Sequence, residues 1–210
     1  MKKFLLAAAV VLAFASPASA QYSTTAGYGG GFPDGAGALL TDTEGRIPTY
    51  SYTVNDYTPT TSATAMLSIC GSSTKTVRVR RVLVGGDATA NAIYDVYLFK
   101  RTTLNTGGTA TSPTATLHDS KNPTASATLY LYTANPSGLG TGTMFRGGHL
   151  LLPNATTPTT TPLWWDWQFG TVNEQSLVLR GAAECLEISN NGNTVPGGTS
   201  IYLTISWTEE

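Results

Sequence analysis

The clearest pattern of apolar and polar positions lies near the end of the chain. In residues 201–207 every second side chain is large and apolar, and the side chains between them carry hydroxyl groups. Successive side chains of a strand point to opposite faces, so this period of two predicts a half-buried strand. Residues 93–100 and 127–132 show the same period. In residues 76–84 the period slips at Arg80-Arg81, which predicts a β-bulge.

Clusters of Gly, Asn and Pro separate these segments from further short apolar runs. With no stretch of helical period between them, the sequence predicts about eight strands. We therefore expect an all-β fold: a two-sheet antiparallel β-sandwich, jelly-roll-like, with an extended N-terminal arm. An outer-membrane barrel fits less well, because its strands need about 9–11 residues. The further strand segments are residues 66–70, 149–152, 163–169, 176–179 and 183–188.

The first twenty residues have the layout of a secretory signal peptide. Lys2 and Lys3 precede an apolar run from Phe4 to Phe14, and Ala18-Ser19-Ala20 supplies small residues before a cleavage point. The alternative is a membrane anchor, but the run is short of the about 20 residues that span a bilayer. We expect residues 1–20 to be removed, with no transmembrane span left, and the protein to be secreted, periplasmic or at the cell surface.

Residues 21–64 are expected to form a Gly/Thr/Tyr-rich arm that precedes a β-sandwich domain over residues 65–210. The glycines of residues 27–31 disfavour a packed element. Tyr50 and Tyr52 are candidate contact residues, because a tyrosine buries a large area at low entropic cost. The arm either becomes ordered on a neighbouring subunit or remains a flexible tail.

Composition and charge narrow the function. Only 12% of residues are charged, and loss of Lys2 and Lys3 takes the formal net charge from −1 to −3. Nucleic-acid binding is disfavoured, because it needs clustered cations. The densest basic stretch, Arg78, Arg80 and Arg81, is interpreted as a solvated strand face rather than a phosphate site.

Cys70 and Cys185 are the only cysteines. Export to an oxidising compartment would permit a disulfide between them, whereas two buried free thiols are the alternative. Two cysteines and two histidines without ligand spacing predict no metal site, and no cofactor is expected.

The sequence predicts no catalytic site and therefore no enzyme. His118-Asp119-Ser120 has the residue types of a triad, but adjacent residues of an extended chain point to opposite faces. We interpret this segment as a polar turn. Asp166 lies among tryptophans, where burial could raise its pKa, yet no second acid is placed opposite it for glycoside hydrolysis.

The densest aromatic segment supplies the candidate binding residues Trp164 and Trp167. Alternation sends Trp165 and Trp167 to one face and Trp164 and Asp166 to the other. An exposed face could contact a sugar or a protein. The alternative is that all of these rings belong to the core or to a subunit interface.

Several strand and turn segments of the chain from Val77 onward can be compared with known proteins: residues 94–101, 118–120, 133–136, 177–181, 195–198 and 207–210. In these segments the chain resembles a group of uncharacterised β-sandwich proteins from tailed phages and bacterial genomes. The resemblance implies a jelly-roll-like, oligomeric, structural or adhesive protein, and the signal peptide favours a cell-surface or periplasmic role over a capsid role.

Our leading hypothesis is an exported, non-enzymatic, structural or adhesion-type β-sandwich that acts through self-association or surface contact. Its expected partners are further copies of itself, a glycan or a cell-surface protein. A carbohydrate-binding, lectin-like module is the alternative, and a glycoside-type hydrolase that uses Asp166 is the third hypothesis.

Overall fold

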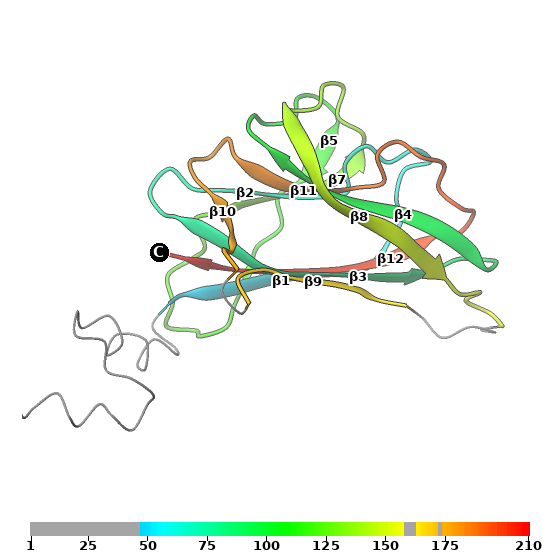
Figure 1. The fold of residues 1–210 in the computed structure, drawn as a ribbon, viewed down its shortest axis with the longest axis horizontal. Helices are drawn as coiled ribbons and strands as arrows, with labels where there is room; N and C mark the ends of the chain where they lie inside the picture. Colours follow the sequence, from blue (N-terminus) through cyan, green and yellow to red (C-terminus); the bar gives the residue numbers. More distant parts are fainter. Residues whose placement is uncertain (1–46, 158–162, 172–173) are drawn as a thin grey trace, which may run out of the picture. The chain divides into compact units, whose positions relative to one another are not determined.

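The computed structural model describes residues 47–157, 163–171 and 174–210 of the chain (Figure 1). In this part the protein is all-β, with two six-stranded antiparallel sheets stacked face to face, as the sequence predicts. Twelve strands are present there, against the about eight expected. They are β1 (Thr49–Tyr57), β2 (Leu67–Cys70), β3 (Val77–Asp87), β4 (Ala92–Arg101), β5 (Thr109–Thr111), β6 (Thr116–Leu117), β7 (Thr128–Ala134), β8 (Gly142–Leu152), β9 (Trp165–Gln168), β10 (Leu177–Leu179), β11 (Cys185–Ser189) and β12 (Ser200–Glu209).

The strand order is that of a jelly roll. Sheet A has the order β10-β3-β12-β1-β6, with β9 also paired to β3, and sheet B has the order β5-β7-β2-β11-β4-β8. The first four strands pair with the last ones in reverse: β1 with β12, β2 with β11, β3 with β9 and β10, and β4 with β8. A long antiparallel ribbon that wraps around in this way produces two Greek-key sheets. The segment between β4 and β8 adds β5 and β7 to sheet B and β6 to sheet A.

The start of the sandwich differs from the sequence prediction. The arm was expected to reach residue 64, but β1 is an integral strand of sheet A, between β12 and β6. Tyr50 is fully buried, and Tyr52 packs against the core, because both point to the inner face. Tyr50 is therefore a core residue, and Tyr52 is a partly buried residue of sheet A that packs against the core, so neither belongs to a separate arm. The predicted signal peptide and residues 21–46 lie outside the described residues.

The core fills the space between the sheets. Trp207 of β12 is fully buried and stacks on Tyr50, with the ring centroids 5.8 Å apart. The bulge predicted at Arg80-Arg81 is confirmed, because the register of β3 against β12 shifts between the pair Arg81–Ser206 and the pair Val79–Trp207. The bulge keeps the valines on both sides of it directed inward.

Cys70 of β2 and Cys185 of β11 lie directly opposite each other in sheet B and form a disulfide. The bond joins positions 115 residues apart in the sequence. It therefore ties the first half of the wrapped ribbon to the second. The described part of the chain contains no helix long and apolar enough to cross a membrane.

Candidate functional site

The aromatic segment is divided between the core and the surface. In β9, Trp165 lies opposite Val84 and Trp167 opposite Val82, so both rings enter the core side of sheet A. Trp167 is only 7% exposed, which removes it from the candidate contact residues predicted from the sequence. Trp164, one position earlier, is 51% exposed. The alternation of a strand explains why one predicted contact residue is on the surface and the other is not.

Trp164 lies flat against the outer face of sheet A. A Cβ atom at Gly85 would overlap its indole ring, so the glycine makes room for the ring on the sheet surface. The ring of Tyr202, on the neighbouring strand β12, lies 6.0 Å from it at an interplanar angle of 33°. The indole therefore packs on the sheet at Gly85 and against the ring of Tyr202, while about half of its surface remains in solvent.

Two carboxylates lie beside this aromatic pair. The Tyr202 hydroxyl donates a hydrogen bond to Asp87 Oδ2 at 3.2 Å. Burial, followed by the charges of Asp87 and Asp56, raises the pKa of Tyr202. Asp56 has a φ of 54° at an irregularity of β1, a conformation that Asp tolerates better than most residues. Its Oδ1 accepts a hydrogen bond from the Ser200 hydroxyl at 3.3 Å.

We call Trp164, Tyr202, Asp87, Asp56 and Ser200 together the Trp164 face. The sheet continues from it with small hydroxyl side chains, such as Thr53 and Thr204, whose oxygens are 3.0 Å apart. The result is a flat surface with one aromatic platform, several hydroxyl groups and two carboxylates. Such a surface offers an apolar plane for stacking together with donors and acceptors at its border.

Asp166 is bound in an ion pair with Arg81. The Arg81 guanidinium donates two hydrogen bonds to its two carboxylate oxygens, at 2.8 and 3.0 Å. These hydrogen bonds lower the pKa of Asp166 despite partial desolvation. The expectation that burial could raise this pKa is wrong, because β9 points Asp166 outward, beside Arg81 of β3. A general acid needs the opposite shift.

His118, Asp119 and Ser120 form an exposed turn, as the sequence predicts. Asp119 Oδ1 accepts the backbone N–H of Lys121, and the Asp119 carbonyl accepts that of Asn122. These bonds close a turn and leave no convergent triad. Within the described ranges no three His, Cys, Asp or Glu side chains gather in a group that could hold a metal ion.

Trp164 was predicted from the sequence as a contact residue, but its neighbours Tyr202, Asp56 and Asp87 were not. Tyr202 has the outward phase of residues 201–207, which was a usable signal for its exposure. Asp56 and Asp87 gave none, because they meet Tyr202 only through the pairing of β12 with β1 and β3. Comparison with protein-family models, with curated protein sequences and with solved structures found no match.

Proposed function

We propose that this chain is an exported, non-enzymatic, adhesion-type β-sandwich that contacts a polysaccharide through the Trp164 face. The observation that carries the proposal is the half-exposed indole of Trp164, held flat on sheet A over Gly85. Keeping a large apolar ring rigid and in solvent offers contact area at low entropic cost. An indole laid on a flat sheet matches the apolar face of a sugar ring.

The neighbours of Trp164 favour a glycan over a protein surface. Tyr202, Ser200, Asp56 and Asp87 are hydrogen-bonding groups, whereas the centre of a protein interface is depleted of charged residues. Sugar hydroxyls can donate to carboxylates and accept from hydroxyl groups, so these side chains suit the rim of a stacked ring.

Two features support the exported location. Residues 1–20 have the layout of a signal peptide. The Cys70–Cys185 disulfide is of a kind that persists in oxidising compartments and is rare in the cytosol. The ion pair that keeps Asp166 charged weighs against the hydrolase hypothesis.

Sedimentation with insoluble polysaccharides tests the proposal. The mature protein is mixed with cellulose, chitin and peptidoglycan, and the bound fraction is compared with that of Trp164→Ala. Leu139→Ala is the matched control, because Leu139 is also about half exposed and lies in a loop beside sheet B. We expect the wild type and the control to bind at least one of these solids and Trp164→Ala to lose at least about tenfold in affinity.

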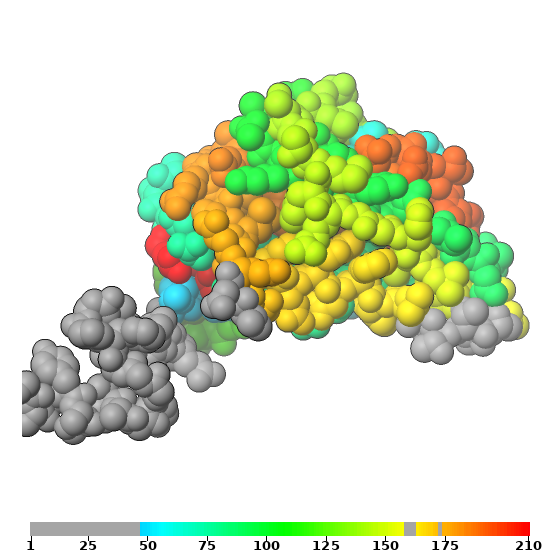
Figure 2. All heavy atoms as spheres, viewed as in Figure 1, coloured from blue at the N-terminus to red at the C-terminus, as the bar shows by residue number. Residues whose placement is uncertain are grey.

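Self-association is a second candidate function, favoured by β8. This strand forms the edge of sheet B and crosses the front of the molecule above β9 (Figures 1 and 2). Its first residues are exposed, and Met144 and Phe145 are 45% and 38% exposed. A long exposed edge strand is a template for pairing with another chain. We expect the mass from light scattering to be that of a dimer or a larger oligomer for the wild type. We expect Met144→Lys to be a monomer, because a charge on the exposed edge opposes strand pairing. A monomeric wild type would exclude self-association.

A further inference from the structure

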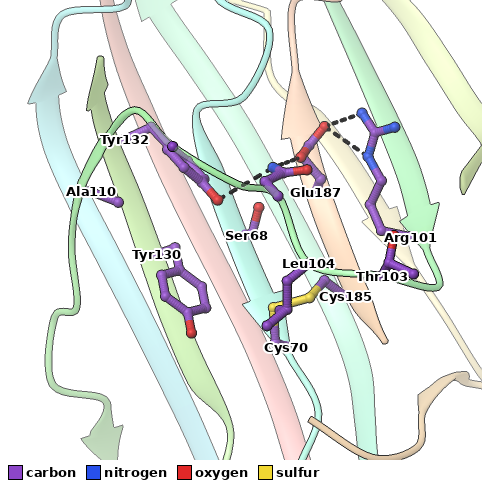
Figure 3. A pocket seen from close by; sticks show the side chains of 12 residues that line it. Ser68, Cys70, Arg101, Thr103, Leu104, Ala110, Tyr130, Tyr132, Cys185 and Glu187 are labelled. Carbon is purple, nitrogen blue, oxygen red and sulfur yellow. Dashed lines mark hydrogen bonds and ion pairs between the residues drawn. A yellow bond between two sulfur atoms is a disulfide. The ribbon is translucent and has the colours of Figure 1, made fainter. Parts of the chain in front are cut away.

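A pocket lies on the outer face of sheet B, on the side of the sandwich opposite the Trp164 face. It has a volume of about 220 Å3 (Figure 3). The Cys70–Cys185 disulfide and Ser68 form its floor, and Tyr130 and Tyr132 of β7 form one wall. The loop after β4, with Leu104 and its neighbours, covers the other side. The pocket shares no residue with the Trp164 face.

A buried ion pair forms one end of the pocket. Glu187 of β11 is fully buried, and its Oε1 accepts hydrogen bonds from Nη2 and Nε of Arg101, at 2.5 and 3.2 Å. Asn105 Nδ2 donates to the other oxygen, Oε2, at 2.5 Å. The carboxylate and the guanidinium are the two charged groups of the lining, so their charges cancel. The lining therefore carries no net charge that would favour an anion or a cation.

The loop that covers the pocket is fixed by the same groups. Arg101 Nη1 donates to the carbonyl of Gly140 at 2.9 Å, and the backbone N–H of Gly140 donates to Asn105 Oδ1 at 2.8 Å. Asn105 Nδ2 also lies 3.3 Å from the Tyr132 hydroxyl. The polar end of the pocket is therefore preorganised, which lowers the cost of ordering it around a ligand.

Ser68 supplies a hydroxyl group that lacks a partner. Its side chain is 2% exposed, and its Oγ makes no hydrogen bond of ordinary geometry among the described residues. It lies near the Tyr132 hydroxyl, close enough to affect the pKa of that group, which burial raises. In Figure 3 the Ser68 oxygen points toward Tyr132 and Glu187. An unpaired buried hydroxyl destabilises the folded state, and a ligand with its own hydroxyl groups would supply the missing hydrogen bond.

We propose that this pocket binds one neutral, polyhydroxylated molecule of the size of a single sugar ring. Its volume exceeds the about 150 Å3 of an engineered cavity that holds benzene, which suits one six-membered ring with its hydroxyl groups. Tyr130, Leu104 and the disulfide offer an apolar floor and wall for the ring. The hydroxyls of Ser68 and Tyr132 can accept and donate hydrogen bonds on the polar side, where Glu187 and Arg101 are already bonded to each other. The site is independent of the polysaccharide contact proposed for the Trp164 face.

Titration of the disulfide-bonded mature protein with free monosaccharides tests the proposal. The probes are glucose, galactose, mannose and N-acetylglucosamine, with glucuronate and glucosamine as charged counterparts, observed by saturation-transfer NMR. A ligand of about a dozen heavy atoms is expected to bind with a Kd of about 1 mM. We expect at least one neutral sugar to bind saturably and its charged counterpart to bind at least tenfold more weakly.

The variant Ser68→Ala separates binding from folding. Alanine removes the unpaired hydroxyl and adds no atom at this buried site, so we expect nearly unchanged thermal stability and at least a tenfold loss of sugar affinity. Ser73→Ala, an exposed serine in the loop after β2, is the control and is expected to bind as the wild type does. Absence of saturable binding of every neutral sugar, equal binding of the charged sugars, or wild-type affinity in Ser68→Ala would each overturn the proposal. Because the probes are soluble single rings, this titration tests the pocket alone, whereas polysaccharide sedimentation tests the Trp164 face.

Discussion

Replacing Glu209 by Gln is expected to destabilise the sandwich far more than its position next to the C-terminus suggests. Glu209 is 1% exposed. Its Oε1 accepts the backbone N–H groups of Ser126 and Ala127 at 3.0 and 2.9 Å. The Ser126 hydroxyl donates to Oε2 at 2.6 Å, and Trp207 Nε1 donates to Oε1 at 3.1 Å. Lys75 supplies the opposite charge at 3.4 Å.

The loss of stability can be derived from the hydrogen bonds that the glutamine amide cannot accept. Gln places an NH2 group where donors already converge, so at least one bond to a charged group is lost, and a buried donor is left unpaired. Such bonds are worth about 1.5–3 kcal/mol, and an unpaired buried group costs about 1–3 kcal/mol. We expect a loss of about 3–5 kcal/mol, a large part of the about 5–15 kcal/mol that stabilises a domain.

Urea unfolding followed by tryptophan fluorescence measures this loss. Glu210→Gln is the matched control, because Glu210 makes an exposed ion pair with Arg78 that is worth at most about 1 kcal/mol. A difference of less than 1 kcal/mol between Glu209→Gln and Glu210→Gln would refute the reasoning.

The same carboxylate makes stability depend on pH. Burial raises the pKa of Glu209, but the hydrogen bonds from Ser126, Ala127 and Trp207 outweigh it, and the net pKa is lowered. A folded-state pKa below the unfolded one gives stability that is fully present above the unfolded value and is lost as the pH falls through the folded value. The wild type is therefore expected to lose stability below about pH 4 more steeply than Glu209→Gln. Parallel pH profiles would contradict this assignment.

Two further variants follow from the structure. Replacing Cys70 and Cys185 together by Ala is expected to lower the free energy of unfolding by about 4–5 kcal/mol, because the bond closes a loop of more than a hundred residues; a loss below about 1 kcal/mol in urea unfolding would contradict this. Gly85→Ala is expected to displace the Trp164 ring, because the added Cβ atom would overlap the indole. We expect this variant to bind polysaccharide about as weakly as Trp164→Ala in the sedimentation assay. Unchanged binding would show that the position of the indole over Gly85 is not needed for binding.

The sequence correctly predicted the features that depend on residues close together in the chain. The period of residues 201–207 gave strand β12, and alternation gave opposite faces to Trp164 and Trp167. Strand β1 was missed because its tyrosines lie among Thr, Ser and Asp, and because Asp56 interrupts its pairing.

Features that depend on which strands pair could not be predicted from local sequence patterns. The sequence could not decide between a disulfide and two free thiols, because the disulfide requires β2 to lie beside β11. The pocket on sheet B was not foreseen, since Ser68, Arg101, Tyr132 and Glu187 come from four strands far apart in the sequence. Each of these residues is unremarkable alone, and only the jelly-roll order brings them together.

Polysaccharide sedimentation of the mature protein beside Trp164→Ala tests the central claim most directly. We predict that the wild type binds at least one of cellulose, chitin and peptidoglycan, and that the variant loses at least about tenfold in affinity while it unfolds at nearly the same urea concentration. Equal binding by the two proteins, or no binding of any of the solids by the wild type, would contradict it.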